Sequence, residues 1–266
     1  MVREYFLKIS HHWKILFRDR AYKISLLTGL LVFAAGFFVN YYFSLYHDNF
    51  IYASVGDSIL NALPTYDLEF LFIDGFYVII FILFAYPIFI RPELAPFMLK
   101  TFGLLMMIRS GFIMLTHVGP PEGFFYGAAD DIYGGPFKRF IFRNDLFFSG
   151  HTSIPFLGFL LLRGEKFRWF FFASSIVMGA TVLLMHVHYS IDVFSAFFIA
   201  HGIYVLSDRI FNNLNVRFAR KIKIHGWKAL QKRMTSLRER KLKKLRNALK
   251  SSKYSFKKSK NGNRKN

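Results

Sequence analysis

Long apolar segments separated by short polar ones make up most of the first 207 residues of the chain. A helix needs roughly 20 mostly apolar residues to cross the hydrocarbon core of a bilayer. The first segment is too long for the apolar core of a signal peptide and no small-residue cleavage site follows it, so we expect it to be retained as a span. Six windows predict an all-α, polytopic membrane protein with six transmembrane helices: Ser25–Tyr46, Leu71–Ile90, Phe97–Thr116, Leu146–Leu162, Trp169–Met185 and Ile191–Ser207.

Lys and Arg are distributed unevenly among the segments that flank these windows. The N-terminal arm, residues 1–24, has six of them, and the connections after the second and fourth windows have one and three. Residues 47–70, between the first two windows, have none and carry four acids. Because cytoplasmic connections are the ones enriched in Lys and Arg, we expect both termini to be cytoplasmic. An even number of spans agrees with this orientation.

The composition combines two properties that soluble domains rarely share. Hydrophobic residues make up 53% of the chain, yet its net charge is +20. The charge is concentrated in residues 208–266, which hold 21 Lys and Arg against 2 acids, whereas the residues before them hold 15 against 14. This distribution excludes a disordered protein, a collagen-like fibre and an ordinary soluble enzyme. The absence of cysteine excludes disulfides, Cys-ligated iron–sulfur clusters and Cys-type zinc sites.

These differences divide the chain into a basic cytoplasmic arm (1–24), a membrane domain (25–207), a basic segment (208–250) and a tail (251–266). The tail is rich in Ser, Lys and Asn and should be disordered. In the basic segment, apolar residues recur every three or four positions between the bases, which predicts an amphipathic cytoplasmic helix. We expect it to bind anionic lipids of the inner leaflet, where each base contributes about 1 kcal/mol. A solvated positive anchor is the alternative, and nucleic acid is not an expected partner.

Ionisable residues near membrane depth are costly and often mark function. His188 and Asp192 are four residues apart and so share one face of a helix. The Asp192 carboxylate can accept a hydrogen bond from one imidazole nitrogen and leave the other oriented for nucleophilic attack. His151 follows Ser149-Gly150 at the outer start of the fourth window, where it could protonate a leaving oxygen. The predicted topology places these three side chains at the same membrane face.

Each histidine also has a simpler interpretation. A lone histidine near a membrane interface is usually a hydrogen-bonding residue, and this interpretation is favoured for His117, His186 and His201. A zinc site made of His151, His186 and His188 is conceivable, because three histidines can hold catalytic zinc. However, residues two apart lie on different sides of a helix, which disfavours ligation by both His186 and His188.

The two histidine segments resemble the catalytic motifs of the sphingomyelin synthase family, a branch of the type 2 phosphatidic acid phosphatase superfamily. The motifs are Phe148-Ser149-Gly150-His151-Thr152 and His188-Tyr189-Ser190-Ile191-Asp192-Val193, with Asp145-x-x-Phe as the lead-in to the first. Arg109-Ser110 followed by Pro120-Pro121 is similar to a further motif of that family. The resemblance covers about residues 25–207. The opening Lys-x6-Arg-Pro signature of the broader superfamily is absent.

The resemblance implies a six-helix bundle in which His188 is the nucleophile, Asp192 orients it and His151 acts on the leaving group. No metal or cofactor takes part in such a reaction. A phospholipid would donate its phospho-head-group to a lipid hydroxyl; with water as acceptor the protein would be a lipid phosphate phosphatase. The site would lie on the periplasmic, lumenal or extracellular face. A non-enzymatic membrane protein, such as a transporter or scaffold, is the alternative from another class.

Further candidates for binding phosphate or substrate surround the two motifs. The guanidinium of Arg109 is suited to a bidentate phosphate contact; this role or that of a substrate gate is favoured over a structural group that satisfies buried carbonyls. The other candidates are Asp145, Ser149, Gly150 and Tyr189.

Overall fold

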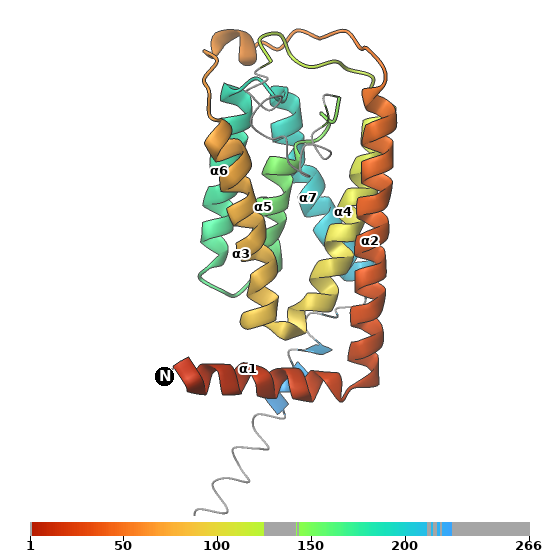
Figure 1. Ribbon diagram of the computed structural model, residues 1–266, viewed down its shortest axis with the longest axis vertical. Helices are drawn as coiled ribbons and strands as arrows, with labels where there is room; N and C mark the ends of the chain where they lie inside the picture. The colour runs from red at the N-terminus through yellow and green to blue at the C-terminus, as the bar shows by residue number, and fades with distance from the viewer. Residues whose placement is uncertain are drawn as a thin grey trace, which may run out of the picture. The chain divides into compact units, whose positions relative to one another are not determined.

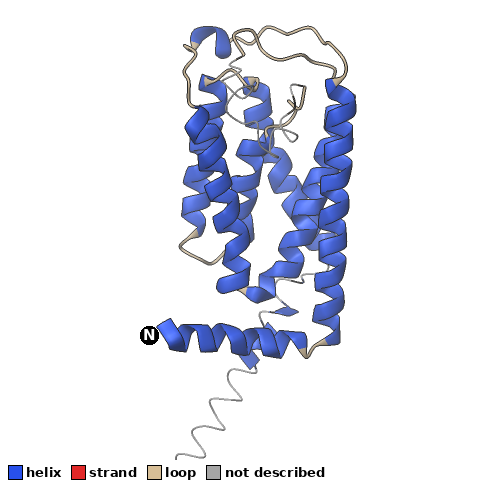
Figure 2. Cartoon of the chain, viewed as in Figure 1, coloured by secondary structure: helices blue, strands red, loops and turns tan. Residues whose placement is uncertain are grey.

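The computed structural model describes residues 2–124, 142, 144–211, 214, 217–218 and 220–224, with side chains from residue 9 onward. The secondary structure in this part of the chain is helical, and it contains no strand (Figure 2). Contacts divide the chain into two units, Met1–Phe218 and Ala219–Asn266. Of the second unit only residues 220–224 are described, and they are helical. Most of the expected basic helix and the whole tail therefore lie outside the described residues.

The first unit is a bundle of helices, and the N-terminal helix α1 lies across one end of it (Figure 1). Helix α2 packs mainly on α4, α5 packs on α6 and α7, and α7 also contacts α4. A π turn, Leu71–Gly75, leads into α3, and a 3-10 turn, Pro92–Leu94, leads into α4. The α-helices of this unit are α1 Val2–Phe17, α2 Arg20–Asp48, α3 Phe76–Phe89, α4 Ala95–Leu115, α5 Gly150–Leu161, α6 Arg168–Leu184 and α7 Ser190–Ile210.

Four of the described helical segments are long and apolar enough to cross a membrane. They are Arg20–Asp48, Leu71–Phe89, Pro92–Leu115 and Ser190–Ile210. The other two predicted spans are apolar but shorter helices, Gly150–Leu161 and Arg168–Leu184. At 1.5 Å per residue, the 12 residues of α5 reach only about 18 Å, well short of a hydrocarbon core. The predicted window began at Leu146, but the helix begins at Gly150 because Ser149 is its N-cap.

Large apolar side chains cover the outside of the bundle. Leu31, Phe38, Phe81 and Phe198 are each more than 60% exposed, and they project from α2, α3 and α7. A soluble monomer rarely exposes apolar surface on this scale. Together with the four long apolar helices, this surface is what a multi-pass membrane protein requires.

Two glycines let α2 and α4 approach closely. A Cβ atom added at Gly36 would lie 2.4 Å from the carbonyl oxygen of Gly103, and one added at Gly103 would lie 2.5 Å from that of Val32. Both distances are far below van der Waals contact with a backbone atom that cannot move aside. The two helices therefore touch backbone to backbone, in the manner of small-residue contacts between membrane helices.

The N-terminal arm is helical, and the second helix begins inside it. It forms helix α1, and α2 begins at Arg20 rather than near residue 25, with the Asp19 carboxylate accepting the Ala21 N–H at 2.9 Å. The indole of Trp13 donates to the Ile88 carbonyl, so α1 is fixed to the end of α3. The first unit also continues past residue 207, because the ring of Phe218 packs edge-on against that of Tyr22.

Candidate active site

The start of α7 brings His188 and Asp192 together. Nδ1 of His188 lies 3.3 Å from Oδ2 of Asp192, and both side chains are buried. The same oxygen accepts the Tyr189 N–H at 3.0 Å, so this carboxylate also satisfies an otherwise free N–H at the helix start. With Nδ1 facing a carboxylate, the imidazole is fixed as the tautomer whose Nε2 carries the lone pair.

The start of α5 carries His151. Ser149 accepts the Thr152 N–H and caps the helix, which places Gly150 and His151 in its first turn. The His151 ring lies between the rings of Phe72 and Phe76, with centroid distances of 4.1 and 4.0 Å. These two aromatic contacts fix the plane of the imidazole. The free N–H groups of the first turn of a helix attract anions.

Arg109, from α4, holds the segment that leads into this turn. Its Nη1 lies 2.6 Å from Oδ1 of Asp145, Nη2 donates to the Asp145 carbonyl at 3.2 Å, and Nε donates to the Phe148 carbonyl at 3.0 Å. The guanidinium also lies next to Gly150, since a Cβ added there would be 3.6 Å from Nε. Arg109 therefore fixes the lead-in segment through Asp145 and Phe148, while its positive charge stays beside the first turn of α5.

The two helix starts meet. The Ser149 N–H donates to the Asp192 carbonyl at 3.2 Å, joining the lead-in of α5 to the first turn of α7. His151 is close enough to both His188 and Arg109 to interact with them electrostatically. Two imidazoles, a carboxylate, a guanidinium and the N-terminus of a helix thus converge. Such a set can bind an anion, attack it and exchange a proton with it.

Tyr189, one of the candidate binding residues, makes two hydrogen bonds to distant parts of the chain through its hydroxyl. Its hydroxyl donates to the Gly119 carbonyl at 2.8 Å and accepts the Val55 N–H at 3.1 Å. Burial of the ring raises the pKa of this hydroxyl above its ordinary value. The side chain therefore ties together two connections at this end of the bundle.

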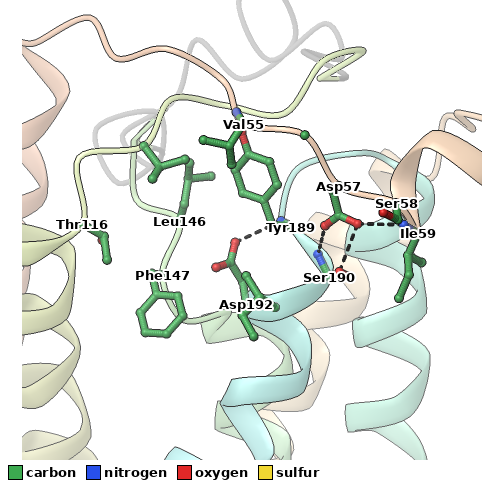
Figure 3. Close-up of a pocket in the computed structure, with 13 residues that line it drawn as sticks. Val55, Asp57, Ser58, Ile59, Thr116, Leu146, Phe147, Tyr189, Ser190 and Asp192 are labelled. Atoms are coloured by element: carbon green, nitrogen blue, oxygen red, sulfur yellow. Dashed lines mark hydrogen bonds between the residues drawn. The ribbon is translucent and has the colours of Figure 1, made fainter.

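A pocket of about 360 Å³ opens beside Asp192 (Figure 3). Leu146 and Phe147 form one side, while Tyr189, Ser190 and Asp57 lie across from them. No Lys or Arg is among the residues that line it, and its walls are mostly apolar. An uncharged acyl chain could therefore bind in this pocket, next to the Asp192 carboxylate that orients His188.

The structure brings some of the candidate residues together and separates others. The two joined helix starts carry His151, His188, Asp192, Asp145, Ser149 and Gly150. Arg109 of α4 contacts the lead-in to α5 through Asp145 and Phe148. His186 lies elsewhere, because its ring nitrogens face the carbonyls of Glu122 and Leu63, at 3.0 and 3.3 Å. His186 therefore does not share a site with His151 and His188, and among the described residues no three His, Asp or Glu side chains are grouped so that they could hold a metal.

The two remaining histidines are also elsewhere. His201 lies exposed on α7, away from its N-terminus. The ring of His117 contacts the rings of His47 and Tyr52. Neither is part of the two joined helix starts, in line with the simpler interpretation of both.

Sequence reasoning missed three residues that shape the site. Phe72 and Phe76 are four apart and so share a helix face, but the chain has 35 Phe, and this spacing alone carried no signal. Asp57 was noted only as one of four acids in the first connection. Its carboxylate bonds to Ser190, a contact between residues 133 positions apart that no local pattern could indicate.

No protein-family model, curated protein or solved structure matches this chain.

Proposed function

We propose that this chain is an integral membrane lipid phosphotransferase of the sphingomyelin synthase type, which moves a phospho-head-group between lipids through His188. The observation that carries the proposal is the contact between Nδ1 of His188 and Oδ2 of Asp192, with His151 and the N-terminus of α5 beside it. The two sequence motifs that resemble that family are the segments that meet here.

Two balanced steps follow from this arrangement. Nε2 of His188 attacks the phosphorus of the donor lipid and forms a P–N bond, while the P–O bond to the donor's glycerol oxygen breaks. His151, which takes up a proton when the anionic donor binds, gives it to that oxygen. The acceptor hydroxyl then attacks phosphorus, gives its proton to His151 and releases His188. Arg109 and the N–H groups of α5 offset the negative charge that builds up on the phosphoryl oxygens.

The pocket beside Asp192 favours a lipid acceptor over water. Its apolar walls suit a chain, and Asp192 and Ser190 supply polar atoms for a hydroxyl group. A lipid phosphate phosphatase is the second candidate, because the same residues would catalyse hydrolysis if water reached the phosphohistidine first.

The proposal includes a six-span bundle of the type 2 phosphatidic acid phosphatase kind. In this bundle, α5 and α6 are short spans, and the segments that flank them complete the crossing of the bilayer. Both termini lie in the cytoplasm, and the site faces the periplasm, lumen or exterior. The basic segment 208–250 binds anionic lipids of the inner leaflet.

Product analysis separates the two candidates. The purified protein is incubated with a phospholipid labelled in its head group, with and without diacylglycerol or ceramide. A labelled lipid product that depends on the added acceptor supports the transferase. Water-soluble phosphate or phospho-head-group as the only labelled product supports the hydrolase, and the absence of any product in a range of donor lipids contradicts both.

A further inference from the structure

The turn that carries His188 is held by residues 49–70, the part of the first connection that follows α2. The Tyr66 N–H donates to the Leu184 carbonyl at 2.8 Å, just before the turn. The Leu63 carbonyl lies 3.3 Å from Nε2 of His186, and the Val55 N–H donates to the Tyr189 hydroxyl at 3.1 Å. The connection therefore contacts the turn on both sides of His188.

Asp57 makes the most concentrated of these contacts. Oδ2 accepts the Ser190 N–H at 2.6 Å and Oδ1 accepts the Ser190 hydroxyl at 3.0 Å (Figure 3). Oδ1 also accepts the N–H groups of Ile59 and Leu60, at 2.9 and 3.2 Å. Burial opposes ionisation of this carboxyl, but the hydrogen bonds from Ser190, Leu60 and Ile59 outweigh it and lower its pKa below the ordinary value. Asp57 is therefore a carboxylate with four donors.

Ser190 is the residue through which Asp57 acts on the site. It is the first residue of α7 and lies between His188 and Asp192 in the sequence. A carboxylate at this point satisfies a free N–H and interacts favourably with the helix dipole. The contact between His188 and Asp192 is long, at 3.3 Å, so a small displacement of the helix start would break it.

We propose that Asp57 is a positioning residue, which fixes the first residue of α7 and thereby keeps the His188 imidazole aligned with Asp192. Its effect on turnover rests on the proposed function, whereas its effect on the His188 side chain does not. Asp57 touches neither histidine and takes no part in proton transfer.

Asp67 provides a matched control. It is an acid of the same connection, and its Oδ1 accepts the N–H of Glu69, two residues away. The changes Asp57→Ala and Asp67→Ala therefore remove the same group from the same connection, and only the first removes a contact to α7. Asp57→Asn retains one carbonyl acceptor for the Ser190 N–H, and Ser190→Ala removes only the hydroxyl contact.

The first measurement needs no substrate. Each variant, in detergent, is treated with diethyl pyrocarbonate, and carbethoxylation of His188 is followed by peptide mass spectrometry, with the exposed His11 of α1 as the reference. Loss of two hydrogen bonds to a charged group should raise the rate at His188 about tenfold in Asp57→Ala. Asp57→Asn and Ser190→Ala should give intermediate rates, and Asp67→Ala should match the unmodified protein.

The second measurement uses lipid turnover. Asp57→Ala should lower kcat about 10²-fold, as misplacement of a reacting group does, and leave the KM for the donor lipid within about twofold. Equal His188 labelling in Asp57→Ala and Asp67→Ala would overturn the proposal, as would equal kcat. Faster labelling in Asp57→Ala, in a protein that turns over no lipid, would uphold the role of Asp57 and count against the proposed function alone. If Asp57→Asn labels His188 more slowly than Asp57→Ala does, the effect comes from the lost contact to Ser190 and not from a general loss of the fold.

Discussion

Oδ2 of Asp192 accepts the Tyr189 N–H at 3.0 Å and also lies 3.3 Å from Nδ1 of His188. One carboxylate oxygen thus caps the start of α7 and orients the imidazole. Because the cap fixes the carboxylate independently of the histidine, the imidazole is the partner that becomes aligned. The tautomer of His188 is therefore determined by the same contact that starts the helix.

Substitution of His188 and of Asp192 should distinguish loss of the nucleophile from loss of the group that orients it. His188→Ala removes the nucleophile and should lower turnover by at least about 10³-fold. Asp192→Asn presents an amide that no longer favours the required tautomer, so we expect a loss of about 10²–10⁴-fold with residual activity. Initial rates with labelled phospholipid, normalised to the amount of folded protein, provide the test. Activity near that of the unmodified protein in His188→Ala would remove the basis of the mechanism.

The helices could be predicted from the sequence because burial in lipid imposes a length and a composition that are visible locally. The pairing of His188 with Asp192 was expected from a shared helix face, but His188 lies in the turn before α7, which begins at Ser190, and the contact arises because Asp192 caps the start of that helix. The proximity of Asp57 to Ser190 was not predictable, because it depends on how the first connection folds back over α7. The starts of α2 and α5 were misplaced because a capping side chain, Asp19 or Ser149, decides where a helix begins.

Arg109→Lys distinguishes a positioning role from direct phosphate binding. Lysine cannot reach the carbonyls of Asp145 and Phe148 with separate fixed donors, and a buried carbonyl left without a partner costs about 1–3 kcal/mol. We therefore expect a lower thermal midpoint in detergent together with a lower kcat. Arg163→Lys is the control, because Arg163 is exposed and its cation lies over the ring of Tyr204. An unchanged midpoint with a raised KM would instead indicate a phosphate clamp.

The contact between α2 and α4 predicts a difference between two glycines of one helix. Gly103→Ala would place a methyl group 2.5 Å from the Val32 carbonyl oxygen, so the helices must separate and lose packing. Gly111 lies in open space on the same helix, and Gly111→Ala should be neutral or slightly stabilising because alanine favours helix by about 1 kcal/mol. Thermal unfolding in detergent measures both. Equal midpoints would show that the helices do not touch at Gly103.

The orientation of the protein in the membrane can be tested without a substrate. The chain has no cysteine, so single cysteines can be introduced cleanly. Ser58 and Lys166 are both exposed and lie in different connections. Ser58→Cys should react with a membrane-impermeant maleimide added to intact cells, and Lys166→Cys should react only after permeabilisation. The reverse pattern would place the candidate site in the cytoplasm.

The most direct test of the central claim is capture of the covalent intermediate on His188. The purified protein is mixed with a donor phospholipid labelled in its phospho-head-group, without an acceptor, and quenched with alkali, in which a phosphoramidate survives. The account predicts protein-bound label on the peptide that contains His188 and none in His188→Ala. It also predicts that diacylglycerol or ceramide, added before the quench, discharges the label into lipid. Label on another residue, or equal label in His188→Ala, would contradict the assignment of His188 as the nucleophile.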